Sequence, residues 1–138
     1  MKPMLIFDFN GTLYDSKSGQ LVPDCKQVLN KLKPQYTLIL LSGSSEERKN
    51  KATELLGSYF KEMVFVSEKS EKVIWDILYK YHASPTSCTL IGDTFTEEIL
   101  RGIKVGCNTI FISPNIVNNK NIPATHTFSK IKNILEVL

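Results

Sequence analysis

The chain has 138 residues, a net charge of +3, 42% hydrophobic residues and 22% charged residues. This length suits one domain with a single core, and the charge is too small to indicate a nucleic-acid-binding protein. No stretch approaches the ~18 apolar residues that span a bilayer. The short apolar run at the N-terminus contains Asp8, unlike a secretory signal peptide. The three cysteines form no CxxC pair, which argues against a disulfide framework or a zinc site. We therefore expect a cytoplasmic protein that does not contact a membrane.

Short apolar runs alternate with amphipathic stretches along the whole chain. In chain order, strands are predicted at residues 4–7, 36–43, 63–67, 88–92 and 107–113. Helices are predicted at residues 23–33, 44–60, 70–82, 96–106 and 128–138, the last after a Pro/Asn-rich loop at 113–123. Strands that are apolar throughout are typical of a parallel sheet covered by helices on both faces. The predicted fold is a single Rossmann-like, three-layer α/β/α domain, residues 1–138, with a five-stranded parallel sheet.

Polar side chains gather where these strands end. Asp8, Asn10 and Gly11 follow the first strand, and the second ends in Ser42 and Gly43. Lys69 follows the third strand and Asp93 the fourth. Ligands of open parallel sheets bind beyond the carboxyl ends of the strands. Carboxylates, hydroxyls and a lysine gathered there are suited to a phosphoryl group and Mg²⁺.

Four short motifs resemble those of the haloacid dehalogenase (HAD) superfamily, whose members are mostly Mg²⁺-dependent phosphatases. They read FDFNGTLYD, LLSGSS, SEKSEK and IGDTFTEE, and each follows a predicted strand in the family's order. The resemblance covers nearly the whole chain. It implies an enzyme that hydrolyses or transfers a phosphoryl group through an aspartyl-phosphate.

Residue by residue, the resemblance implies that Asp8 is the nucleophile and that Ser42 and Gly43 contact the phosphate. The family's lysine corresponds to Lys69 or Lys72. We prefer Lys69 because it directly follows the strand, whereas Lys72 lies one turn into the helix.

The resemblance also implies a metal site. Asp8, the backbone carbonyl of Asn10, Asp93 and Glu97 are expected to hold Mg²⁺. Glu97 has the family's spacing from Asp93, while Glu98 fits a looser spacing.

Asn10 departs from the family pattern. Phosphatases of this superfamily have an aspartate there that protonates the leaving group and then activates water. An amide does neither, and the loss of general acid–base help typically costs about 10²–10⁴-fold in rate. Three explanations remain open: an engineered substitution, a natural enzyme that uses a good leaving group or another base, and a pseudo-phosphatase that binds phosphate or a partner without catalysis.

The spacing of the motifs bears on the substrate. The intervals from Asp8 to Ser42 and from Ser42 to Lys69 each have room for one helix and its loops, which excludes a large cap domain. Residues 14–22 can form at most a small flap. Relatives without a cap often act on macromolecules or form oligomers, so a phosphorylated small molecule, a phosphorylated macromolecule and an oligomer all stay open. Nucleic acid is not indicated as a partner, but it is not excluded as a substrate.

A different class, the response-regulator receiver domain, also has a phosphorylated aspartate on a five-stranded sheet. It would need that aspartate after the third strand, where this chain has Glu68.

Overall fold

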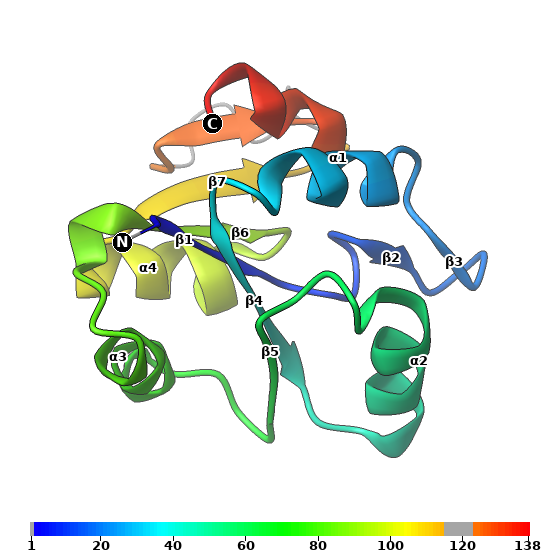
Figure 1. Cartoon of the computed structure of the whole chain (residues 1–138), viewed down its shortest axis with the longest axis horizontal. Coiled ribbons are helices and arrows are strands. Elements are labelled where there is room, and N and C mark those ends of the chain that lie inside the picture. The colour runs from blue at the N-terminus through cyan, green and yellow to red at the C-terminus, as the bar shows by residue number, and fades with distance from the viewer. Residues whose placement is uncertain (1, 115–122) are drawn as a thin grey trace.

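The computed structural model describes residues 2–114 and 123–138. In this part of the chain, six strands form a parallel sheet in the order β5-β4-β1-β6-β7-β8 (Figure 1). They are β1 (Met4–Phe7), β4 (Thr37–Gly43), β5 (Glu62–Val66), β6 (Cys88–Gly92), β7 (Asn108–Ile112) and β8 (His126–Phe128). Two further strands, β2 (Tyr14–Asp15) and β3 (Gln20–Leu21), form a separate antiparallel hairpin.

Helices cover both faces of the sheet, as the apolar strands predicted. Side chains of successive strand residues point to opposite faces, so Leu5 and Phe7 belong to one core cluster while Met4 and Ile6 belong to the other. The first cluster is completed by α1 (Cys25–Leu32), α2 (Glu46–Leu56) and a C-terminal 3₁₀ helix (Ile131–Glu136). The second is completed by α3 (Glu71–Lys80) and α4 (Leu100–Val105). The fold is therefore a three-layer α/β/α sandwich.

The order of the strands places β1 in the interior of the sheet, with β4 on one side and β6 on the other. Apart from the hairpin, the sheet follows the order 3-2-1-4-5-6 in chain sequence, which is that of doubly wound nucleotide-binding folds. Receiver domains have the order 2-1-3-4-5, so the receiver alternative is excluded. In such sheets ligands bind where the strand order reverses, which here is between β1 and β6.

Three details differ from the sequence-based prediction. The sheet has a sixth strand, β8, because Phe111 pairs with Thr127 beyond the expected edge. The helix predicted at 128–138 is shorter, and only Ile131–Glu136 are helical, in a 3₁₀ turn. The helix predicted at 96–106 is two pieces, a π-helical turn (Phe95–Ile99) and α4.

Other predictions concern single features. Cys25, Cys88 and Cys107 are all buried, and none forms a disulfide in the described part of the chain. No helix among residues 2–114 and 123–138 is long and apolar enough to cross a membrane. Most of the loop predicted at 113–123 lies outside the described residues.

Candidate active site

Asp8 is the first residue after β1, and its side chain is buried against a lysine. Its backbone N–H donates to the carbonyl of Ile91 on β6 at 3.0 Å, which continues the sheet to the site. Lys69, which follows β5, donates from Nζ to Oδ1 of Asp8 at 2.7 Å. Only 8% of each residue is exposed. The pair therefore lies at the carboxyl end of the sheet, where the sequence placed the site.

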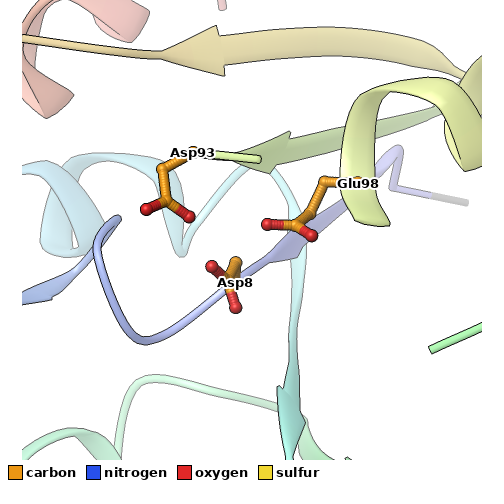
Figure 2. A group of neighbouring side chains, drawn as sticks. All are labelled: Asp8, Asp93 and Glu98. Atoms are coloured by element: carbon orange, nitrogen blue, oxygen red, sulfur yellow. The ribbon is translucent and has the colours of Figure 1, made fainter. Parts of the chain in front are cut away.

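Two further carboxylates face Asp8 from the other side of the point where the strand order reverses. Asp93 follows β6, and Glu98 lies on the π-helical turn (Figure 2). One oxygen from each of Asp8, Asp93 and Glu98 lies within 4.8 Å of the other two. The Nζ atom of Lys69 is 3.6 Å from Oε2 of Glu98. Three carboxylates therefore converge, and the ammonium group of Lys69 lies against two of them, Asp8 and Glu98.

Two glycines allow these carboxylates to approach the backbone. Gly11 has φ +83°, a left-handed conformation that favours glycine, and a Cβ there would collide with the carboxylate of Asp93. A Cβ on Gly92 would lie 2.6 Å from Oε1 of Glu98. Any side chain at either position would push an acid out of the cluster.

The structure brings Glu98 into the site in place of Glu97. In the π-helical turn the N–H of Leu100 bonds to the carbonyl of Phe95, five residues back. The wider turn directs Glu98 inward, with 4% of the residue exposed, and leaves Glu97 exposed. The hydroxyl of Thr94 donates to Oε2 of Glu98 at 2.8 Å and holds the carboxylate in place. The spacing rule that favoured Glu97 assumed an ordinary helix, and the contribution of Thr94 was not predicted.

The remaining predicted residues divide into two groups. Ser42 is buried at the end of β4 and donates to the carbonyl of Gly43 at 3.2 Å. Asn10 is half-buried in the loop after Asp8. Lys72 does not reach the site: its side chain is 84% exposed and pairs with Asp76 at 2.9 Å. Lys72 is the second residue of α3, two residues past the N-cap Ser70, and its side chain lies in solvent.

The electrostatics of the cluster favour a bound cation. Burial and the nearby charge of Asp8 raise the pKa of Asp93 to about 7 and that of Glu98 to about 8. Burial alone would lower the pKa of Lys69, but Asp8 and Glu98 raise it above the ordinary value. Oε1 of Glu98 is buried and has no hydrogen-bond partner among the described residues. Oxygen ligands with excess negative charge and an unsatisfied buried oxygen fit a hard divalent ion such as Mg²⁺.

The fold is that of the haloacid dehalogenase-like hydrolases, because solved structures of that class share it. Structures of that class superpose on nearly the whole chain. A HAD phosphatase from Thermococcus onnurineus matches with a TM-score of 0.82 and 15% identity, over 99% of this chain and 97% of that one. A haloacid dehalogenase-like hydrolase from Streptococcus pneumoniae matches with a TM-score of 0.81 and 16% identity, over 98% and 97%.

A third structure, a HAD-hydrolase from Bacillus subtilis bound to magnesium, has a TM-score of 0.76 and 19% identity. It covers 88% of this chain, but this chain spans only 58% of its length. No protein-family model matches the sequence, and no curated protein matches it. At these identities the likeness establishes the HAD-like fold.

Proposed function

We propose that this protein is a Mg²⁺-dependent phosphohydrolase or phosphotransferase that forms an aspartyl-phosphate on Asp8. The observation that supports this most directly is the position of Asp8. It ends an interior strand, bonds to Lys69 at 2.7 Å, and faces two more carboxylates. The hydrolase and phosphatase activities of proteins with the same fold agree with this proposal. We also propose that the protein acts as a single core domain without a large cap domain.

Magnesium would be held by the carboxylates of Asp8, Asp93 and Glu98, with the backbone carbonyl of Asn10 as a further oxygen ligand by resemblance to the family. When bound, Mg²⁺ reduces the repulsion between the carboxylate of Asp8 and the phosphoryl oxygens and orients both. Glu98 takes the role that the sequence assigned to Glu97, because Glu97 is exposed.

The reaction then proceeds through the chain's own groups. A carboxylate oxygen of Asp8 attacks phosphorus as the bond to the leaving oxygen breaks, and the phosphoryl group passes to Asp8. Lys69 neutralises charge on the phosphoryl oxygens, and the Ser42 hydroxyl and the Gly43 backbone contact them. Water, or another acceptor in a phosphotransferase, then attacks the phosphorus and regenerates the Asp8 carboxylate.

Asn10 limits both steps in this proposal. It supplies no proton to the leaving oxygen and takes none from the attacking water, so turnover is about 10²–10⁴-fold slower than with an acid at this position. The same amide supports the second candidate, a pseudo-phosphatase that binds phosphate or a partner without turnover.

The test uses p-nitrophenyl phosphate with Mg²⁺ and the variants Asn10→Asp and Asp8→Asn. We expect Asn10→Asp to raise kcat, and Asp8→Asn to abolish activity in both the native and the Asn10→Asp background. A binding protein would show Mg²⁺ and phosphate binding but no gain in Asn10→Asp. If Mg²⁺ does not bind and no variant hydrolyses any phosphate ester, the enzyme proposal is refuted.

A further inference from the structure

A pocket of about 200 Å³ is lined by Phe9 and Asn10 of the loop that follows Asp8, and it has no role in the chemistry described so far. It lies between the β2–β3 hairpin and the first half of α2, which are close to each other in Figure 1. Its lining consists of Phe9, Asn10, Tyr14, Ser16, Ser45, Glu47, Arg48 and Lys51. Asn10 occupies the position that faces the leaving group in the family, so this pocket is where the leaving group would lie.

Two cations of α2 face this pocket without an anionic partner. Arg48 and Lys51 are one turn apart and half-buried, and neither forms an ion pair with residues 2–114 or 123–138. A Cβ on Gly43 would lie 2.6 Å from Nη1 of Arg48, so the guanidinium rests against the backbone that follows Ser42. Half-burying a cation without a partner is unfavourable, and an anionic ligand would offset that cost.

The acid in the pocket does not neutralise this pair. Glu47 is exposed, whereas Arg48 and Lys51 are half-buried, so the inner part of the pocket is positively charged. A guanidinium next to an ammonium suits a carboxylate or a phosphate, since Arg can bind either through two parallel hydrogen bonds.

The opposite wall suits a short carbon skeleton. The rings of Phe9 and Tyr14 stack with centroids 4.8 Å apart and planes 9° apart, and they form an apolar wall beside the hydroxyls of Ser16 and Ser45. The volume is below the roughly 300–1,000 Å³ of pockets for drug-sized ligands. A compound of a few carbons fits these dimensions better than a segment of a macromolecule.

We propose that the substrate is a small phosphate monoester whose leaving group carries a second acidic group, a carboxylate or a phosphate, bound by Arg48 and Lys51. This inference rests on the proposed phosphohydrolase function. The ester phosphate binds at Asp8 and Lys69, and the second anion binds at α2. The leaving alcohol is thereby held by both ends while its bond to phosphorus breaks.

The test compares two matched pairs of esters in the presence of Mg²⁺. In one pair, 3-phosphoglycerate and glycerol 3-phosphate differ by a carboxylate in place of a hydroxymethyl group. In the other, propane-1,3-diol bisphosphate and 3-hydroxypropyl phosphate differ by a second phosphate. Each ester is assayed with the native chain and with Asn10→Asp, and its affinity is measured by calorimetry. The pair with the larger preference identifies the second anion.

We expect kcat/KM to favour the acidic member of at least one pair by about 10–100-fold. Arg48→Gln and Lys51→Gln should each reduce that preference about tenfold. Lys49→Gln is the matched control, because Lys49 is exposed on the same helix and does not line the pocket; it should leave the preference unchanged.

The outcomes separate the two proposals. Equal rates within both pairs, or faster hydrolysis of a phosphoserine peptide than of all four esters, would overturn the inference and leave the proposed function standing. If none of the four esters is hydrolysed even by Asn10→Asp, p-nitrophenyl phosphate decides the proposed function, which fails if that ester is not hydrolysed either and Mg²⁺ does not bind. Calorimetry then decides the inference: it fails if the acidic members bind no more tightly than their partners, and stands if they bind more tightly and Arg48→Gln removes the difference.

Discussion

Replacing Glu98 by glutamine, with Glu97→Gln as the control, tests the placement of the metal ligands. The two residues are adjacent and chemically identical, but only Glu98 lies in the carboxylate cluster, with 4% of the residue exposed. The substitution keeps the size of the side chain and removes its charge. Changes to the outer partners that only orient metal ligands typically cost about 10–100-fold in metal affinity, and we take this range as the minimum for a direct ligand. We expect that loss for Glu98→Gln and less than about twofold for Glu97→Gln.

The loss of Mg²⁺ affinity can be measured as a smaller Mg²⁺-induced rise in the melting temperature Tm. Magnesium at about 100 times its Kd stabilises the native state by about 2.7 kcal/mol, and a 100-fold weaker site at the same concentration gives only about 0.4 kcal/mol. Unfolding entropy of about 2.1 cal/mol/K per residue, over 138 residues, is about 0.29 kcal/mol/K. The Mg²⁺-induced rise in Tm should therefore be about 9 °C for the native chain and for Glu97→Gln. For Glu98→Gln it should be between about 5 °C and 1 °C.

The assay is a thermal melt of each protein with and without Mg²⁺, and calorimetric titration gives Kd directly. The metal-free Tm of Glu98→Gln should change little at pH 7, because the pKa of Glu98 is raised to about 8, so the side chain is mostly neutral there, as glutamine is. If Glu97→Gln weakens Mg²⁺ binding as much as Glu98→Gln, the placement of the π-helical turn is wrong.

Three other predictions concern the lysine, a glycine and pH. Lys69→Met should lower kcat by about 10²–10³-fold, which is the usual cost of removing one group that stabilises transition-state charge. The control Lys72→Met should change kcat by less than about twofold. Equal effects of the two substitutions in steady-state assays would contradict the choice of Lys69 as the phosphate-binding lysine. Gly11→Ala and Gly19→Ala both place a side chain at positive φ (83° and 71°) and should each destabilise the fold by ~1–3 kcal/mol, but only Gly11→Ala displaces the carboxylate of Asp93 and should also abolish Mg²⁺ binding in calorimetry. In the native state the pKa of Asp93 is raised to about 7 and that of Glu98 to about 8. Both side chains therefore keep protons that the unfolded chain releases at about pH 4. Their contribution to metal-free stability therefore falls as pH rises from about 4 to 8, and Mg²⁺ affinity rises by about tenfold or more between pH 6 and pH 8; titrations that give the same Kd at both values would refute this.

Much of this arrangement could be predicted because the signals were local and repeated. Residues 4–7, 36–43 and 88–92 are apolar on both faces, and each is a strand of the parallel sheet. Because parallel strands end at the same edge of the sheet, the polar residues that follow these strands lie close together at its carboxyl edge. Lys69 could be preferred over Lys72 from distance along the chain alone, and the structure places it against Asp8.

The misplaced features depend on hydrogen bonds that a sequence pattern does not specify. Residues 126–128 are too few to show a strand period, and their strand exists because β7 offers an open edge. Glu97 and Glu98 differ by one position, and the π-helical turn decides which of them faces Asp8. Such turns are rare, frequently occur at functional sites and have no reliable sequence signature.

The position of β1 gives the two sides of the site different local stabilities. Backbone bonds tie β1 to β4 on one side and to β6 on the other, so the amides that lead to Asp8 should exchange with deuterium only when the whole sheet opens. The β2–β3 hairpin pairs through only two residues on each strand, Tyr14 with Leu21 and Asp15 with Gln20. Its amides should exchange far sooner, so we expect the hairpin side of the pocket beside Asn10 to open more often than the strand that carries the nucleophile.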